Sequence, residues 1–271
     1  MKRLERLGSV AFFTVTASLV FHLIGMSYNS WRVTTCHNCD PLNPLASWRT
    51  SVRQRCYDAG VAALFLSNDT SSRVSANAFL TQVCIPNQFL IVDDPNEAFN
   101  CLINASRQPD LICLSRRRGQ NCKCDYTKRT KAVLAMTVLA ALSLGILMFL
   151  SHLVAFVKID YILRWLIPLC FVLLLFSILC IVVAISAAGG KLDEDLYHLR
   201  SRWAAVEEFS TDGPINENWE ARFINLTHAQ YDVKVGWCFG MEILALYFSL
   251  VSLVIYALMF FAKSRPDPRE K

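Results

Sequence analysis

The longest apolar stretch of this chain reads IDYILRWLIPLCFVLLLFSILCIVVAISAA and covers residues 159–188. A helix rises about 1.5 Å per residue, so about 20 apolar residues cross a hydrocarbon core of about 30 Å. The stretch contains two charged residues, Asp160 and Arg164, and both lie at its start, where their polar ends can reach the lipid headgroups. The stretch therefore predicts a transmembrane helix.

Three further stretches have the same character: residues 8–27, 132–157 and 235–262. The whole chain is 54% hydrophobic and 18% charged, which favours a membrane protein over a soluble domain. The first stretch follows a basic start, as in a secretory signal peptide, but its apolar run is longer than the ~7–15 residues of a signal core. We therefore expect four spans, with cleavage of the first as the alternative.

Eight of the 11 cysteines fall between the first two spans, and the other three, Cys170, Cys180 and Cys238, fall inside spans. An even number at this density predicts disulfides, which persist on the oxidising side of a membrane. A zinc site is the alternative, because two pairs of these cysteines stand close together in the sequence. Eight cysteines allow about 105 pairings, and the sequence does not choose among them. The eight are Cys36, Cys39, Cys56, Cys84, Cys101, Cys113, Cys122 and Cys124.

N-glycosylation sequons give a second signal for orientation. Asn68 and Asn104 begin sequons in the cysteine-rich loop, and Asn225 begins one in the loop before the last span. Basic residues near the chain ends favour a cytosolic position for both termini. The basic run Arg116–Arg118 would lie outside, against that tendency, which weakens in loops longer than about 60 residues. We therefore expect both loops outside and both termini in the cytosol.

The predicted plan follows from these signals. Its parts are a cytosolic N-terminus (1–7), a first span (8–27), external loop 1 (28–131), a second span (132–157), a cytosolic hairpin at residue 158, a third span (159–188), external loop 2 (189–234), a fourth span (235–262) and a cytosolic tail (263–271). The fold class is an all-α transmembrane four-helix bundle with a small disulfide-stapled extracellular β-sheet domain.

Local patterns predict elements inside the two external loops. Residues 31–35 and 89–92 are rich in β-branched and aromatic residues and predict short strands, whereas residues 47–66 have helical spacing. In loop 2, apolar residues recur at steps of four and three from Leu192 to Val206 and include Trp203. This pattern predicts an amphipathic helix that continues the third span outward past Gly189 and Gly190.

Two short motifs lie at the ends of the first and last spans. Ser27-Tyr28-Asn29-Ser30-Trp31 resembles the exit from the first span in the claudin superfamily, and the stretch YDVKVGWCFG, residues 231–240, looks like that family's Tyr-x-x-Gly-Trp entry into the fourth span. The superfamily includes claudins, peripheral myelin protein, stargazin-type channel subunits and clarins. The resemblance implies a claudin-like four-pass fold in the plasma membrane, in some members at cell junctions.

The sequence contains no catalytic motif, and we expect a protein that is not an enzyme and that binds no metal, cofactor or nucleic acid. Glu242 lies inside the last span, where a carboxylate usually faces protein or water. We expect it to hydrogen-bond neighbouring helix ends near His22, with contact to a partner's span as the alternative. The partner-binding candidates are Arg116, Arg117, Arg118, Trp203 and Glu242.

The predicted function is that of an interaction protein. Its partners would be the lipid bilayer and another membrane protein, or a second copy of itself, in the role of a channel or receptor accessory subunit or of an adhesion or junction protein. The arginines at 116–118 would meet an acidic surface. The alternative is a self-assembling channel or paracellular pore, which normally needs polar residues along one face of a span. We expect no such stripe in any of the four spans.

Overall fold

The computed structural model describes residues 2–37, 47–58, 82–87, 89–91, 99–103, 111–115, 123–156, 160–190, 192 and 229–264. The chain divides into two compact units, which we call the helical unit and the sheet unit. The helical unit consists of Met1–Tyr28, Ala132–Ala188 and Trp237–Lys271, and the sheet unit consists of Asn29–Lys131 and Gly189–Gly236.

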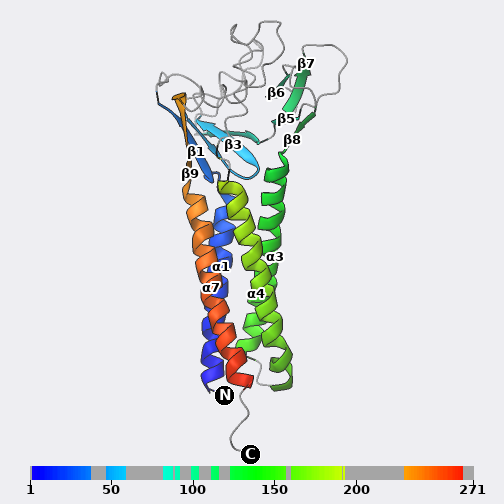
Figure 1. Ribbon diagram of the computed structural model, residues 1–271, viewed down its shortest axis with the longest axis vertical. Helices are drawn as coiled ribbons and strands as arrows, with labels where there is room; N and C mark the ends of the chain where they lie inside the picture. The colour runs from blue at the N-terminus through cyan, green and yellow to red at the C-terminus, as the bar shows by residue number, and fades with distance from the viewer. Residues whose placement is uncertain are drawn as a thin grey trace, which may run out of the picture. The chain divides into compact units, whose positions relative to one another are not determined.

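Four long helices build the helical unit (Figure 1): α1 Lys2–Ser27, α3 Lys128–Phe156, α4 Asp160–Gly189 and α7 Trp237–Ser264. Each is long and apolar enough to cross a membrane, so the chain is a multi-pass membrane protein. Two boundaries differ from the approximate predicted ones. The last helix begins at Trp237 because Val235 belongs to a strand, and the third helix ends at Gly189 instead of continuing past Gly190.

Most of the buried residues of each helix follow one another at steps of three and four. This 3.5-residue period is the pattern of helices that pack as a left-handed bundle, with crossing angles of about 20°. The buried positions among the described residues are Gly8, Ala11, Val15, Ser18, His22 and Gly25 in α1; Val133, Thr137, Ala140, Ser143, Leu144, Leu147, Ser151 and Val154 in α3; Leu163, Leu166, Ile167, Cys170, Leu174, Ser177, Cys180, Ile181, Ala184 and Ala188 in α4; and Cys238, Glu242, Ala245, Ser249, Ser252, Ile255, Tyr256 and Met259 in α7.

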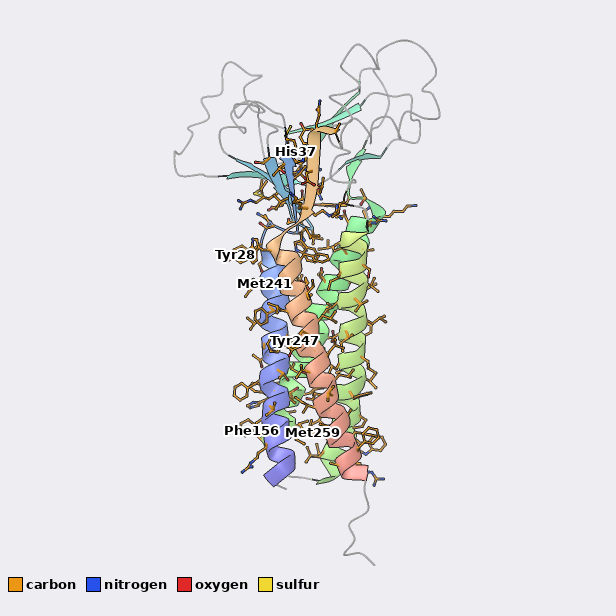
Figure 2. All side chains as sticks on the ribbon, turned by 60° about the vertical axis from the view of Figure 1, so that its left-hand side comes forward. Tyr28, His37, Phe156, Met241, Tyr247 and Met259 are labelled. Atoms are coloured by element: carbon orange, nitrogen blue, oxygen red, sulfur yellow. A yellow bond between two sulfur atoms is a disulfide. The ribbon has the colours of Figure 1, made fainter. Side chains whose placement is uncertain are left out.

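The opposite faces of the helices carry large apolar side chains (Figure 2). Phe156 and Tyr247, for example, are largely exposed, as expected for residues that face lipid tails. The rings of Tyr28 and Trp237 lie 5.1 Å apart at the end of α1 and the start of α7. Tyrosine and tryptophan collect at membrane–water interfaces, so this pair marks one edge of the membrane-spanning region.

An antiparallel sheet of five strands in the order β4-β3-β2-β1-β9 forms the sheet unit. Strand β1, Arg32–Cys36, directly follows the first helix, and β9, Tyr231–Val235, directly precedes the last one. The other three strands are β2 Ser47–Thr50, β3 Gln54–Asp58 and β4 Gln82–Pro86. The pairing of β1 with β9 therefore joins the two predicted external loops in one sheet.

Two smaller antiparallel pairs also belong to the sheet unit. Strand β5, Phe89–Ile91, pairs with β8, Lys123–Asp125, and strand β6, Phe99–Ile103, pairs with β7, Leu111–Ser115. Strands were predicted at residues 31–35 and 89–92, and β1 and β5 confirm both to within a residue.

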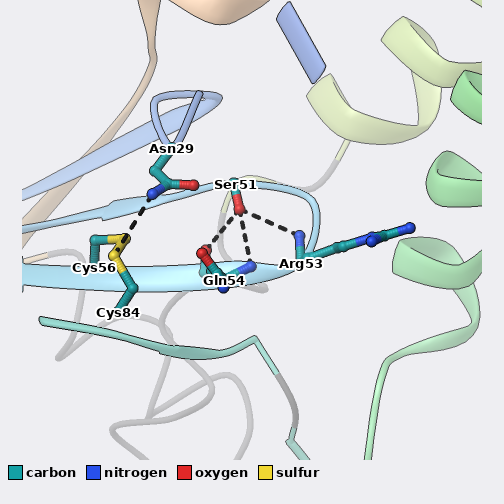
Figure 3. Close-up of a disulfide and its surroundings, with 6 residues drawn as sticks. All are labelled: Asn29, Ser51, Arg53, Gln54, Cys56 and Cys84. Carbon is teal, nitrogen blue, oxygen red and sulfur yellow. Dashed lines mark hydrogen bonds between the residues drawn. A yellow bond between two sulfur atoms is a disulfide. The ribbon is translucent and has the colours of Figure 1, made fainter. Parts of the chain in front are cut away.

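The predicted helical character of residues 47–66 was wrong for the part that the structure describes. Residues 47–58 form the hairpin of β2 and β3, in which burial alternates with a period of two along β2. The Ser51 hydroxyl accepts hydrogen bonds from the backbone N–H groups of Arg53 and Gln54, at 3.3 and 2.9 Å (Figure 3). This local bonding closes a turn where a helix would need its own backbone partners.

The two faces of the sheet differ in burial. Cross-strand register puts Thr34 opposite Trp48, and the Trp48 ring lies 5.5 Å from that of Tyr231, so one face carries a buried aromatic cluster. The register also puts Val33 opposite both Arg49 and Lys234 on the other face, where both basic side chains are exposed. Successive strand residues point to opposite faces, which explains this separation.

A disulfide joins Cys56 of β3 to Cys84 of β4, which are directly opposite each other in the register (Figure 3). Cys36 is also disulfide-bonded. These three thiolates are therefore not available to zinc, and the zinc alternative is wrong for them. Cys170, Cys180 and Cys238 are buried and form no disulfide, as predicted for the cysteines of the spans.

The structure describes Leu192 alone of the predicted amphipathic helix at 192–206, and Trp203 lies outside the described residues. The predicted hairpin at residue 158 and the tail from residue 265 onward also lie outside them.

Candidate functional site

Polar side chains line the interior of the helical unit. Buried polar residues occur in all four helices, and most of them hydrogen-bond to a residue of another helix: Ser18, His22, Thr137, Ser143, Ser151, Ser177, Glu242, Ser249, Ser252 and Tyr256. We call this set the polar seam. The expectation that no span carries a polar stripe was wrong, because Glu242, Ser249, Ser252 and Tyr256 lie along the buried face of α7.

The centre of the polar seam is a contact between His22 and Glu242, two fully buried ionisable side chains. His22 Nδ1 lies 2.7 Å from Glu242 Oε2, and His22 Nε2 lies 2.9 Å from the backbone carbonyl oxygen of Thr137. The contact thus connects α1, α7 and α3. It lies near the start of α7, where Figure 2 marks the neighbouring residue Met241.

Gly25 makes room for the Glu242 carboxyl group. A Cβ atom at position 25 would lie 2.7 Å from Glu242 Oε1 and 3.3 Å from the carbonyl oxygen of Cys238. Real Cβ atoms essentially never approach other atoms this closely. The sequence places Gly25 one turn after His22, so the same face of α1 supplies both the partner of Glu242 and the space for it.

Glu242 Oε1 has no hydrogen-bond partner among the described residues, although it is completely buried. An unpaired polar atom in this position costs more if it carries negative charge than if it is neutral. The two oxygens of this carboxyl group therefore have different environments, one paired with His22 and one unpaired over Gly25.

Smaller hydrogen bonds continue the contact between α1 and α7 toward the other end of the bundle. The Ser18 hydroxyl lies 2.7 Å from that of Ser249 and 2.8 Å from the carbonyl oxygen of Ala245. The Ser252 hydroxyl donates to Thr14 at 2.7 Å. Small side chains let helix backbones approach, and each such bond between spans contributes about 0.6 kcal/mol. The α1–α7 contact therefore combines short polar groups with an aromatic stack, in which the rings of Phe21 and Phe248 lie 5.5 Å apart.

Two further pairs connect the remaining helices. Ser143 of α3 lies 2.7 Å from Ser177 of α4, and Ser151 of α3 lies 2.6 Å from the Tyr256 hydroxyl of α7. In these pairs each side chain satisfies the other within the protein. This pairing stabilises a packed interior and leaves the hydroxyl groups less available for the solvation of an ion.

The predicted site residues have different outcomes. The expected hydrogen bond of Glu242 near His22 is confirmed. Glu242 is buried inside its own bundle, so contact of this carboxyl group with a partner's span was a wrong alternative. Several predictions lie outside the described residues: Asn68, Asn104, Asn225, Cys39, Cys122, Trp203 and Arg116–Arg118. Cys101, Cys113 and Cys124 lie on described strands.

Sequence analysis missed Ser18, Ser249 and Ser252 as members of the site. The available signal was spacing: Ser18 and His22 are four residues apart in α1, and Ser249 and Ser252 are three apart in α7. Hydropathy does not reveal such a row because serine is nearly neutral on those scales. Within the described residues, no group of three or more His, Cys, Asp or Glu side chains could hold a metal ion.

Comparison with known proteins found no family model and no curated protein that matches this chain. The class of the protein is therefore given by its structure: a multi-pass membrane protein with four membrane-spanning helices and a disulfide-linked antiparallel sheet.

Proposed function

We propose that this chain is a non-enzymatic interaction protein of the plasma membrane that binds another membrane protein through its external sheet unit. The observation that carries the proposal is the pairing of β1 with β9, whose five-residue register unites two loops separated by two spans. In a chain with four spans, the first and third loops lie on the same side of the membrane. A single folded surface is thus offered on that side, as an accessory subunit or adhesion protein requires.

We further propose that the chain is a distant member of the claudin superfamily. Three features support this: four spans, Trp48 on the strand next to the disulfide-linked pair β3–β4, and the Tyr231–Gly236–Trp237 entry into α7. This chain departs from the claudin pattern, in which a Gly-Leu-Trp motif precedes two cysteines that stand close together in the sequence, because the sequence separation of Cys56 and Cys84 is 28.

The charge of the external part indicates an acidic partner surface. Arg49 and Lys234 are exposed on one face of the sheet, and Lys234 is partly neutralised by Asp232, 2.6 Å away. The basic run Arg116–Arg118 belongs to the same external loop as Arg49. Positive surfaces steer acidic partners and fix their orientation more than they add affinity.

The test is co-purification from native membranes in mild detergent. We expect a specific membrane protein to accompany the wild type, and the triple variant Arg116→Glu, Arg117→Glu, Arg118→Glu to lose it at equal surface expression. The matched control is Arg49→Glu with Arg53→Glu, two exposed arginines on the β2–β3 hairpin. If only the control variant loses the co-purifying protein, the recognition surface lies on the β2–β3 hairpin and not at Arg116–Arg118.

The alternative function, a self-assembling pore, has its own readout. The purified protein in planar bilayers would conduct ions without any partner. Autonomous conductance together with the absence of a co-purifying protein would overturn the proposal of an interaction protein. The internal pairing of the polar seam favours the interaction protein, because paired and buried hydroxyl groups do not line an open path.

A further inference from the structure

The hydrogen bonds of His22 fix where protons must lie. The carbonyl oxygen of Thr137 can only accept, so the His22 Nε2 atom 2.9 Å away must carry a proton and donate it. The His22 Nδ1 atom and Glu242 Oε2 are 2.7 Å apart, and both are acceptors when unprotonated. One proton must therefore lie between them.

Two arrangements satisfy this count. In the first, His22 is an imidazolium that donates to a Glu242 carboxylate. In the second, Glu242 is a carboxylic acid whose Oε2–H donates to the Nδ1 atom of a neutral His22. Both have zero net charge, so the burial of the pair does not choose between them.

The unpaired Oε1 atom of Glu242 distinguishes the two arrangements. In the first arrangement, Glu242 Oε1 shares the negative charge of the carboxylate while it is buried with no described donor. In the second arrangement, the same atom is a neutral carbonyl oxygen, which tolerates the absence of a donor far better. We propose that Glu242 binds a proton inside the helical bundle and, as a carboxylic acid, donates it to His22.

The surroundings contain little that would change this assignment. From α1 the pair faces Gly25, whose missing side chain leaves space for Oε1, and from α3 it faces the neutral carbonyl group of Thr137. The next titratable group along α7 is the Cys238 thiol, one turn before Glu242. No charged side chain other than His22 and Glu242 takes part in the hydrogen bonds that the structure describes at this site.

Loss of the proton would place two lone pairs 2.7 Å apart and leave a net negative charge in the bundle. His22 of α1 and Glu242 of α7 would then repel each other. The bound proton therefore acts as a ligand that keeps α1, α3 and α7 together. This inference does not depend on the proposed partner of the external unit.

The variant Glu242→Gln separates the two arrangements. Its amide donates permanently to His22 Nδ1 and presents a neutral carbonyl oxygen over Gly25, so it copies the carboxylic acid. We expect the variant to fold and to keep the wild-type melting temperature in detergent near neutral pH. We also expect the wild type to lose stability as pH rises into the alkaline range, and the variant to lose less.

Infrared difference spectroscopy gives the second readout. The wild type, labelled with ¹³C-glutamate, should show the C=O stretch of a protonated carboxylic acid that is insensitive to pH near neutrality and absent from Glu242→Gln. Strong destabilisation of Glu242→Gln, or a carboxylate band alone in the wild type, would overturn the proposal and establish the imidazolium–carboxylate pair. His22→Ala serves as the control, because it removes the acceptor and should destabilise under both arrangements.

Discussion

Gly236 has tighter surroundings than Gly8, Gly25, Gly145 and Gly240. A Cβ atom at position 236 would lie 2.0 Å from the carbonyl oxygen of Ser30, and the Gly236 N–H donates to the carbonyl oxygen of Trp31 at 2.8 Å. Backbone atoms cannot yield as a flexible side chain can. The residue between β9 and α7 must therefore be glycine for β9 to stay paired with β1.

We expect Gly236→Ala to destabilise the protein by about 3 kcal/mol or more, because a backbone–backbone clash must be relieved by separation of the strands. The measurement is the melting temperature of the detergent-solubilised protein together with its delivery to the cell surface. The matched control is Gly240→Ala, one turn into α7, where a Cβ atom meets nothing within 4 Å. Equal behaviour of the two variants would contradict the assigned role of Gly236.

At the scale of elements, two antiparallel strand pairs each place one cysteine directly opposite another. Cys56 and Cys84 are directly opposite each other in β3 and β4 and form a disulfide. Cys101 and Cys113 are directly opposite each other in β6 and β7. Cysteines at opposed positions of antiparallel strands have Cα atoms within the range that a disulfide spans.

We therefore expect a disulfide between Cys101 and Cys113. Mass spectrometry of unreduced proteolytic peptides should find these two residues linked, with the Cys56–Cys84 peptide as the internal reference. With both bridges fixed, the 105 pairings of eight cysteines fall to three. A peptide that joins Cys101 to any other cysteine would show that the β6–β7 register is not the one that the oxidised protein adopts.

Elements differed in how far the sequence predicted them. The four spans were predictable because length and hydropathy are local and strong signals. The β2–β3 hairpin was missed because Trp48, Val52 and Tyr57 also fit a helical period, and the turn at Ser51 depends on a hydroxyl group bonding to its own backbone. The pairing of β1 with β9 joins residues about 200 positions apart, which no local pattern reveals.

The candidate site was predictable in part for a similar reason. Glu242 stood out because a carboxyl group inside a span is costly, and the position of His22 near the same end of α1 made it a candidate partner. The unpaired Oε1 atom and the space at Gly25 depend on the approach of two helices, so they became visible only in the packed bundle.

At the scale of the whole molecule, the predicted topology places both large loops, residues 28–131 and 189–234, on the outer side of the membrane. Treatment of intact cells with a glycosidase should change the gel mobility of the protein, because Asn68, Asn104 and Asn225 lie in the loops that contribute to the sheet unit. A tag after Lys271 should be detected only after the membrane is permeabilised. A tail tag that stains intact cells would reverse the orientation.

The union of β1 with β9 also sets the order of events during synthesis. Strand β1 leaves the ribosome soon after the first helix, whereas its partner β9 is made after three helices have been inserted. Until then, one edge of β1 has no neighbouring strand and is open to wrong pairing with another chain. A chain that stops before Val235 cannot form the β1–β9 pair, so we expect such a truncated chain to associate with other chains more readily than the full chain.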